Sequence, residues 1–205
     1  LAVINIFRGH RLGVFMFTEK LISVANRNDA TKNLINEENA RRLEALSSHM
    51  LEVNKTLNLT AIKDEDGVIL KHLVDSSAVV PFIPEKASLC DIGCGGGFPS
   101  LVIAILRPDV SVFSVDSVSK KVAYVESTAQ KFGLKNEKTS NERAEALGQG
   151  NKREAFDVVT ARAVGRLNLI SELCIPLVKV GGVFLAMKSL STDEELEEAQ
   201  KAIAL

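Results

Sequence analysis

The chain has 205 residues, of which 46% are hydrophobic and 25% are charged, and its formal net charge at pH 7 is −1. These values are ordinary for a soluble globular protein and allow one domain with a sizeable core. The chain is not basic throughout, so a nucleic-acid partner must meet local positive charge or charge outside this chain. The three cysteines, at 90, 94 and 174, form neither a disulfide framework nor a zinc-ligand pattern and indicate buried thiols in a reducing cytosol.

The N-terminal segment gives no sign of a membrane span. No apolar run approaches the ~20 residues that a spanning helix needs. The stretch LGVFMF at 12–17 follows basic residues, but it is too short for a signal peptide and no clear cleavage site follows it. We therefore expect a cytoplasmic protein without membrane contact, and we base no fold prediction on the first dozen residues.

Two helices are predicted in the first part of the chain. Residues 37–57 form an amphipathic pattern that Asn36 is suited to cap. Its apolar positions recur at steps of three and four, at Leu43, Leu46, Met50, Val53 and Leu57. Residues 58–67 are predicted to form a loop, and 68–80 a second helix that stops at Pro81.

From residue 88 onward, short apolar runs alternate with helical patterns. Strands are predicted at 89–92, 110–115, 135–140, 156–161 and 181–187, and helices at 98–106, 119–134, 167–178 and 192–204. The segment KNEKTS at 135–140 is a weak strand prediction because it is poor in β-forming residues. Repeated strand–helix units predict an α/β fold with a parallel sheet covered on both faces. We assign residues 1–84 to an N-terminal helical cap and residues 85–205 to the core domain.

The loop GCGGGFPS after the first strand is the strongest functional signal. A P-loop needs Gly-Lys-Ser/Thr before its helix, and no lysine occurs here. The dinucleotide fingerprint GxGxxG needs a third glycine where Phe98 stands, and Pro99 removes one amide donor. Asp91 at the strand end suits a cation. The acid–apolar–GxGxG pattern resembles motif I of S-adenosylmethionine-dependent methyltransferases.

A second acidic residue, Asp116, ends the next strand, 23 residues after Gly93. A carboxylate there can accept hydrogen bonds from both ribose hydroxyls of a nucleotide cofactor. Because NAD uses the same feature, Asp116 does not separate a methyltransferase from an NAD(P)-linked oxidoreductase. A tight turn without a ligand also remains open at this point.

Seven segments together carry a more specific resemblance. They are NLTAI (58–62), KHLVDS (71–76), DIGCGGGFPS (91–100), VDSVSKKVAYVE (115–126), ERAEAL (142–147), FDVVTARAVGRL (156–167) and PLVKVGGVFLAMKS (176–189). In this order they closely resemble the bacterial family called glucose-inhibited division protein B, the small-subunit ribosomal RNA guanine-N7 methyltransferases. The resemblance implies a Rossmann-like class I fold behind the helical cap. It also implies a cytoplasmic enzyme that uses S-adenosylmethionine and acts on 16S rRNA in the decoding region.

The sequence departs from the family pattern in several places. Val53 stands where tryptophan is frequent, Cys94 replaces threonine or alanine, and Ser100 replaces glycine. None of these changes removes a polar group from the implied site. A class I sheet has seven strands, whereas this chain ends after the helix that follows the fifth, so we expect the C-terminal hairpin and the family's basic tail to be missing.

The resemblance assigns cofactor-binding residues one by one. On the glycine loop these are Gly93 and Phe98, and we add Gly95 between them. At the ribose position they are Asp116 and Ser117, in the ERAE turn Ala144 and Glu145, and beyond the fourth strand Arg162. The residues alone leave other interpretations open: a core aromatic for Phe98, a solvated charge for Glu145 and a surface ion pair for Arg162.

His72 and Asp75 lie three residues apart and share a helix face. A catalytic acid–base pair is one interpretation, but guanine N7 already has a free lone pair and needs no proton removed. We therefore expect catalysis by positioning, with His72, Asp75 and Arg162 as positioning candidates and no assigned catalytic base. Two interpretations, a phosphate contact and a solvated surface charge, stay open for Lys63, Lys71, Lys120, Lys121, Arg166 and Lys188.

The predicted reaction is direct transfer of the methyl group from S-adenosylmethionine to N7 of a guanine in 16S rRNA, with no metal and as a monomer. Three alternatives remain from the sequence. They are a methyltransferase of the same fold with another substrate, an NAD(P)-linked oxidoreductase, and an RNA-binding module without catalysis.

Overall fold

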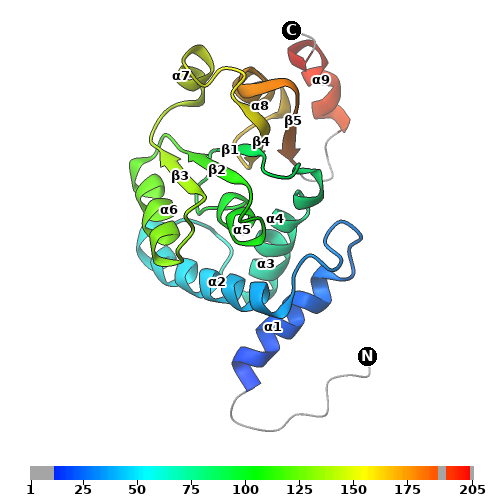
Figure 1. Cartoon of the computed structure of the whole chain (residues 1–205), viewed down its shortest axis with the longest axis vertical. Coiled ribbons are helices and arrows are strands. Elements are labelled where there is room, and N and C mark those ends of the chain that lie inside the picture. Colours follow the sequence, from blue (N-terminus) through cyan, green and yellow to red (C-terminus); the bar gives the residue numbers. More distant parts are fainter. Residues whose placement is uncertain (1–11, 189–192, 204–205) are drawn as a thin grey trace.

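The computed structural model describes residues 12–188 and 193–203 (Figure 1). Its centre is a sheet in the order β3-β2-β1-β4-β5, and all of the pairings are parallel. The strands are β1 (Ser88–Ile92), β2 (Ser111–Val115), β3 (Glu137–Ser140), β4 (Phe156–Arg162) and β5 (Val178–Met187). The direction of strand succession reverses between β1 and β4, so the ligand-binding edge is expected at their carboxyl ends.

Helices cover both faces of the sheet, as the strand–helix alternation predicts. The connecting helices are α5 (Ser100–Leu106), α6 (Ser119–Lys131), α7 (Ala144–Gln149), α8 (Leu167–Cys174) and the C-terminal α9 (Asp193–Ile203). One hydrophobic cluster joins α5 and α6 to one face, where Leu89 and Val112 point, and a second joins α7 and α8 to the other face. The predicted buried thiols are confirmed for all three cysteines.

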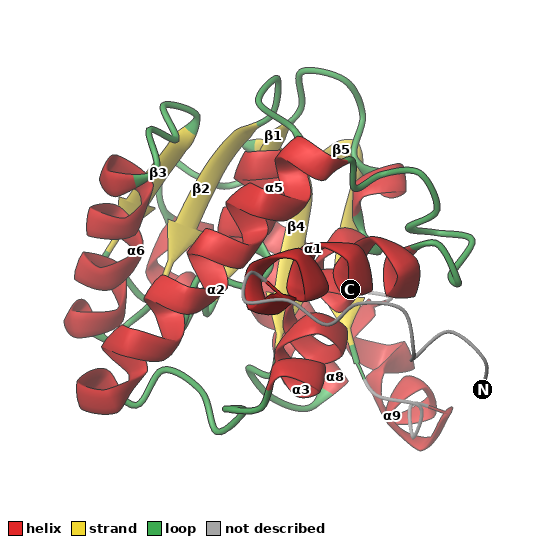
Figure 2. Ribbon diagram, turned by 90° about the horizontal axis from the view of Figure 1, so that it is seen from below, coloured by secondary structure: helices red, strands yellow, loops and turns green. Residues whose placement is uncertain are grey.

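The N-terminal helices pack on the α5 and α6 face (Figure 2). Helix α2 (Glu37–Leu57) has the predicted bounds, and Asn36 Oδ1 accepts a hydrogen bond from the Asn39 amide at 2.8 Å. Helix α1 (Leu12–Ala25), which the sequence analysis does not predict, contacts α2. No helix within the described residues is long and apolar enough to cross a bilayer. The domain boundary at residue 84 stays a prediction.

The second predicted helix differs from the structure. Instead of one helix over 68–80, the chain forms α3 (Glu65–Val68), a π-helical segment (Ile69–Val74), α4 (Asp75–Ser77) and a 3₁₀ turn (Val80–Phe82). The start moves to 65 because Asp64 Oδ1 accepts from the Gly67 amide at 2.7 Å and caps the first turn. Wide π-helical turns recur at functional sites, and this one carries a predicted positioning residue.

Several further bounds differ from the predictions, such as the end of α6 at Lys131 rather than at 134. Strand β3 forms despite its poor β-propensity because it pairs along β2 from Val112 to Val115. The helix predicted over 167–178 ends at Cys174, since a 3₁₀ turn that contains Pro176 follows over Ile175–Leu177, and β5 then starts at Val178 rather than at 181. The ERAE segment, predicted as a turn, leads into the short helix α7.

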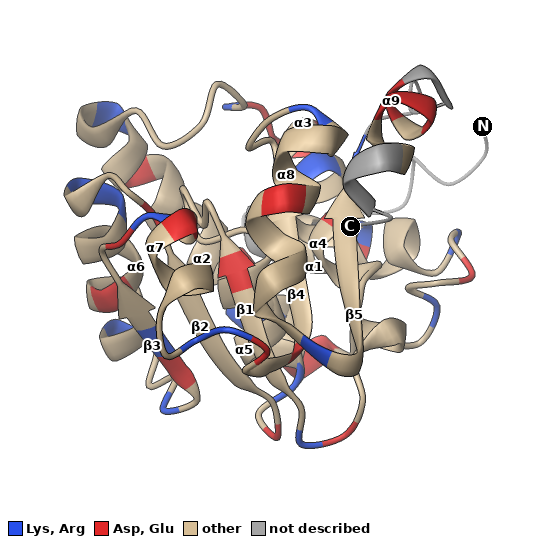
Figure 3. Ribbon diagram, turned by 90° about the horizontal axis from the view of Figure 1, so that it is seen from above, with Lys and Arg blue, Asp and Glu red and all other residues tan. Residues whose placement is uncertain are grey.

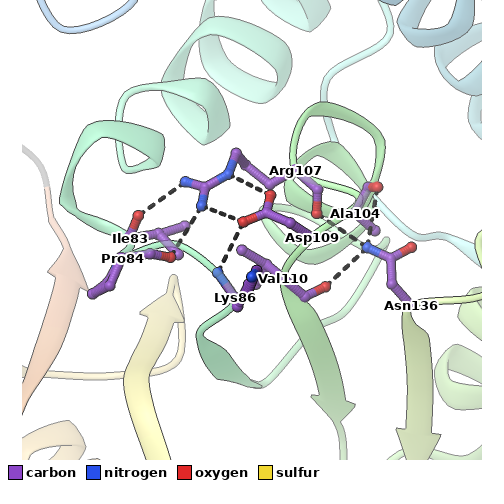
Figure 4. A network of polar contacts seen from close by, with 8 residues as sticks. All are labelled: Ile83, Pro84, Lys86, Ala104, Arg107, Asp109, Val110 and Asn136. Atoms are coloured by element: carbon purple, nitrogen blue, oxygen red, sulfur yellow. Dashed lines mark hydrogen bonds and ion pairs between the residues drawn. The ribbon is translucent and has the colours of Figure 1, made fainter.

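A polar network closes the edge of the sheet opposite to the ligand edge (Figure 4). Arg107 donates to Asp109 and to the carbonyls of Ile83 and Pro84 at 2.8–3.0 Å. The pairing with Arg107 holds the pKa of Asp109 well below its usual range. Asn136 Nδ2 donates to the carbonyls of Ala104, Arg107 and Val110 at 3.0–3.3 Å and thereby ties the end of α5 to the start of β3.

Replacing Asn136 with alanine should destabilise the fold by about 1–3 kcal/mol, because the carbonyl oxygens of Ala104 and Val110 lose their side-chain donor. For a chain of this size, the melting temperature should fall by roughly 2–4 °C for each kcal/mol lost. Thermal and urea unfolding measure the change. Asn151→Ala, at an exposed residue, is the matched control and should leave the melting temperature nearly unchanged. Equal melting temperatures for the two variants would contradict this role.

Candidate active site

The glycine loop follows β1 and turns sharply beneath the end of β2. The amides of Gly93 and Cys94 both donate to the carbonyl of Val115, at 2.8 and 3.0 Å. Gly95 has φ +53°, a conformation that β-branched residues rarely adopt, and a Cβ there would meet nothing closer than 3.7 Å. Glycine is therefore required at 95 by the backbone rather than by packing, and the space beside it is open for a ligand.

Asp116, at the end of β2, holds this loop. Its Oδ2 accepts from the Gly95 amide at 3.0 Å and its Oδ1 accepts from the Val118 amide at 2.9 Å, and the side chain is buried. An ionised carboxylate offers about four acceptor positions, so further donors can still bind. Asp116 thus shapes the loop and keeps acceptor capacity toward the cavity beside it.

A first cavity of about 320 Å³ lies at the carboxyl ends of β1, β2 and β4. It brings together five of the predicted cofactor residues: Gly93, Asp116, Ser117, Ala144 and Glu145. Arg143, which also lines this cavity, donates to Glu145 at 2.7 Å and holds the pKa of that carboxyl below its usual range. The cavity lies at the switch point of the sheet, where the strand order predicts a ligand.

A second cavity of about 440 Å³ adjoins the first, and the two share Gly93, Lys121 and Ala163 in their walls. The remaining predicted cofactor residues, Gly95, Phe98 and Arg162, line this second cavity, as does the positioning candidate His72. Its other wall comes from the 58–62 loop, through Leu59, Thr60, Ala61 and Ile62. The site therefore has two compartments that meet at the glycine loop.

Arg162 lies at the centre of a side-chain cluster that joins the sheet to the π-helical segment. Its Nη1 donates to the carbonyl of Lys71 at 2.6 Å and to Asp75 Oδ2 at 3.1 Å. The guanidinium also lies 5.7 Å from the centre of the Phe98 ring. The side chain is 16% exposed, so this is a largely buried cation rather than a surface ion pair. His72 and Asp75 share one face, as predicted, and both contact Arg162.

The hydrogen bonds of His72 fix its protonation. Arg162 Nη2 can only donate, so His72 Nδ1 accepts at 3.2 Å, and His72 Nε2–H donates to Thr60 Oγ1 at 2.9 Å. The ring also stacks on Phe98, with centroids 4.6 Å apart. Burial, together with the charge of Arg162, lowers the pKa of His72 to about 4. His72 is therefore neutral at pH 7 and its lone pair is already engaged, which is unsuitable for a general base.

Asp91 lies behind the glycine loop rather than in a cavity. Its side chain is 1% exposed, and Thr160 Oγ1 donates to its Oδ1 at 2.8 Å. Burial raises its pKa to about 6. Asp91 does not line either compartment, so the expectation that this carboxylate faces a ligand cation is wrong. It supports the strand from which the loop departs.

The candidate phosphate-binding cations fall into different environments. Lys121 lines both cavities and Lys71 lines the second. Arg166 pairs with Glu198, and Lys188 pairs with Glu195 at 2.7 Å, so acids of α9 neutralise both. Lys63 and Lys120 line neither cavity. Figure 3 shows basic and acidic residues interspersed along the ribbon. Of the six candidate phosphate-binding cations, Lys71 and Lys121 are the two that line the cavities.

Comparison with known proteins decides the family. A family model described as rRNA small subunit methyltransferase G matches residues 39–205. The chain belongs to this family. The rRNA small subunit methyltransferase G family is the one that the sequence motifs indicate, so that prediction is confirmed, and the NAD(P)-linked oxidoreductase is excluded.

Two relatives carry the same description. The chain is 41% identical to the ribosomal RNA small subunit methyltransferase G of Staphylococcus carnosus over 93% of this chain and 80% of the relative. It is 48% identical to that of Lactobacillus delbrueckii subsp. bulgaricus over 75% of this chain and 66% of the relative. The chain thus spans about two thirds of the length of the second relative.

A solved structure supports the fold. The S-adenosylmethionine-dependent O-methyltransferase of Thermotoga maritima superposes with a TM-score of 0.54 and 20% identity, over 76% of this chain and 55% of that one. The Rossmann-like class I fold is confirmed. As a member of the rRNA small subunit methyltransferase G family, the chain is an S-adenosylmethionine-dependent methyltransferase.

Thr60 is the site residue that the sequence analysis missed. The segment NLTAI is one of the seven motif segments, but the sequence alone indicates no role for any of its residues. A polar residue in a motif outside the glycine loop was the available signal. Its place in the second cavity depends on packing between loops about 35 residues apart, which no local pattern predicts.

Proposed function

We propose that this protein transfers a methyl group from S-adenosylmethionine to N7 of a guanine in the 16S rRNA of the small ribosomal subunit. The observation that carries the proposal is the pair of adjoining cavities in a chain of the rRNA small subunit methyltransferase G family. The first cavity is suited to the nucleoside part of the cofactor, and the second to its methionine part and the target base. The proposal includes a cytoplasmic location and action as a monomer without a metal.

The predicted cofactor residues, which lie in both cavities, fit the cofactor. Asp116 has acceptor capacity left for ribose hydroxyls, with Ser117 beside it, and the open face of Gly95 allows close approach. Ala144 and Glu145, at the start of α7, are proposed to contact the adenine. The backbone of Gly93 and the ring of Phe98 complete the proposed set on the glycine loop. When bound, the cofactor supplies an electrophilic methyl group on a sulfonium.

Arg162 is proposed to bind the carboxylate of the cofactor. Hydrogen bonds to the described residues engage three of its five N–H groups, and an anion can take the others. His72 and Asp75 hold the guanidinium in place from the π-helical segment. They are positioning residues in this account, because they touch Arg162 rather than the reacting atoms.

The proposed chemistry is direct in-line displacement by the lone pair of N7, which needs no base. The guanine must leave its helical context, because the deep major groove of A-form RNA hides the N7 edge. The chain's own residues then orient the base in the second cavity and exclude water, with the cationic Lys71 and Lys121 toward the RNA.

The pH dependence of the chemical step tests the role of His72. Because its pKa is about 4, its charge does not change between about pH 5 and 8. The single-turnover rate with saturating cofactor and subunits should show no titration step in that range that His72→Ala removes. His72→Ala should instead bind the cofactor or the ribosomal subunit more weakly, by roughly 5- to 30-fold, because Arg162 loses a contact that positions it. An acid limb that disappears in His72→Ala, with a rate loss on the order of 100-fold, would make His72 a general base.

The substrate is tested by transfer of tritiated methyl groups. The acceptors are small ribosomal subunits and free 16S rRNA that lack the modification, with ribosomal proteins and a small-molecule mixture as controls. Incorporation into 16S rRNA supports the proposal. Cofactor binding without incorporation into any acceptor would point to an RNA-binding module, and incorporation into protein or small molecules to a different substrate.

A further inference from the structure

The 58–62 loop is fixed to helix α2 by one buried amide. Asn54 Nδ2 donates to the carbonyl of Thr60 and Asn54 Oδ1 accepts from its amide, both at 2.9 Å. Asn54 is 7% exposed, so this two-bond contact is shielded from water. The backbone of Thr60 is thereby held at one position in the wall of the second cavity.

Hydrogen bonds also fix the position of the Thr60 hydroxyl group. Its oxygen accepts from the Ile62 amide at 3.1 Å and from His72 Nε2 at 2.9 Å. The direction of the second bond is fixed, because Arg162 occupies His72 Nδ1 as a donor. Both lone pairs of the hydroxyl are then used. Its proton is left to donate, and among the residues that the structure describes no hydrogen bond takes it.

A hydroxyl that can only donate discriminates between the two purines. On the major-groove edge guanine offers the acceptors N7 and O6, whereas adenine offers the acceptor N7 and the donor N6–H₂. N7 must stay free to receive the methyl group, so a donor beside it meets position 6 of the base. There it finds an acceptor in guanine and another donor in adenine.

We infer that Thr60 determines the specificity for guanine, by donating its hydroxyl proton to O6 of the target base. The inference rests on the proposed function and adds the group that selects the base. Thr60 and the glycine loop line the same cavity, which meets the cofactor compartment at Gly93, so a base that directs N7 there carries O6 on the same edge. Arg162 and His72 act on this step as positioning residues, since they fix the direction of the hydrogen bond.

The test combines a change in the enzyme with a change in one atom group of the substrate. Small subunits are reconstituted with guanine or 2-aminopurine, which lacks O6, at the modified position. Single-turnover rates are measured for the parent enzyme, Thr60→Val and Thr60→Ser. We expect 2-aminopurine to slow the parent by roughly 5- to 30-fold, as for one lost hydrogen bond of about 1–2 kcal/mol. Replacing guanine with 2-aminopurine should slow Thr60→Val less than twofold. Thr60→Ser keeps the hydroxyl and should be slowed by the same factor as the parent. We call this factor the penalty.

The penalty is a ratio within one variant, so a loss of folded enzyme cancels. Contacts to other atoms that 2-aminopurine changes cancel when the penalties of the parent and of Thr60→Val are compared. An equal penalty in the parent and in Thr60→Val would overturn the role of Thr60, as would no penalty in the parent. If the parent methylates no guanine N7, the proposed function itself fails. If it methylates guanine N7 and the penalty does not depend on Thr60, only this inference fails.

Discussion

Replacing Asp116 with alanine should weaken the binding of S-adenosylhomocysteine by roughly 1.5–3 kcal/mol, or about 10- to 150-fold. Two losses add to this effect. The substitution removes the carboxylate proposed to accept from the ribose hydroxyls, and it frees the amides of Gly95 and Val118, which Asp116 now holds at 3.0 and 2.9 Å. The loop beneath the cofactor then loses the contact that defines its shape.

Calorimetric titration of the folded variants measures this loss. Asp116→Asn keeps one acceptor oxygen but turns an amide donor toward another donor, so we expect it to bind nearly as weakly as Asp116→Ala. Asp29→Ala removes an exposed acid far along the chain from the site and is the charge-matched control. A loss below a few tenths of a kcal/mol for Asp116→Ala would show that this carboxylate does not accept from the ribose.

Gly95→Val should weaken cofactor binding by at least about 100-fold. The backbone at 95 has φ +53°, which costs a β-branched residue of the order of 1–3 kcal/mol. The new side chain also enters the open space beside the loop, where the nearest atom is now 3.7 Å from the Cβ position. Ligand and side chain then compete for the same volume, and relaxation of the strain displaces the amide that Asp116 binds.

Gly133→Val separates strain from occupancy of the site. Gly133 has φ +66°, a Cβ there would meet nothing within 4 Å, and it lines neither compartment. This variant should lose stability to a similar extent and keep the parent's affinity for S-adenosylhomocysteine. Unchanged affinity in a folded Gly95→Val protein would remove the glycine loop from the cofactor site.

Local chemistry explains which parts of the fold could be predicted. The cap at Asn36, the bounds of α2 and the order of strands and helices follow from spacing and capping, which act within a few residues. Asp116 and the glycine loop could be paired in advance, because parallel strands end at the same edge of the sheet. The sequence also indicated the family through seven ordered segments, each short but specific as a set.

The contacts that build the second cavity were out of reach of such reasoning. Arg162 bonds to the carbonyl of Lys71, 91 residues earlier, and Thr60 meets His72 across the π-helical segment. The spacing of apolar residues over 68–80 fits a regular α-helix and does not indicate the π-helical turn over Ile69–Val74. The sequence thus placed His72 and Asp75 on one face, while their common partner became apparent only in the three-dimensional arrangement.

The proposed reaction modifies one atom of the substrate, and identification of the modified nucleoside tests this most directly. Unmodified small subunits are incubated with the enzyme and labelled S-adenosylmethionine, the 16S rRNA is digested to nucleosides, and the labelled product is identified by mass and chromatography. The account predicts label in 7-methylguanosine at a single position, and its loss with Asp116→Ala at limiting cofactor. Label in any other nucleoside, or at another atom of guanine, would contradict it.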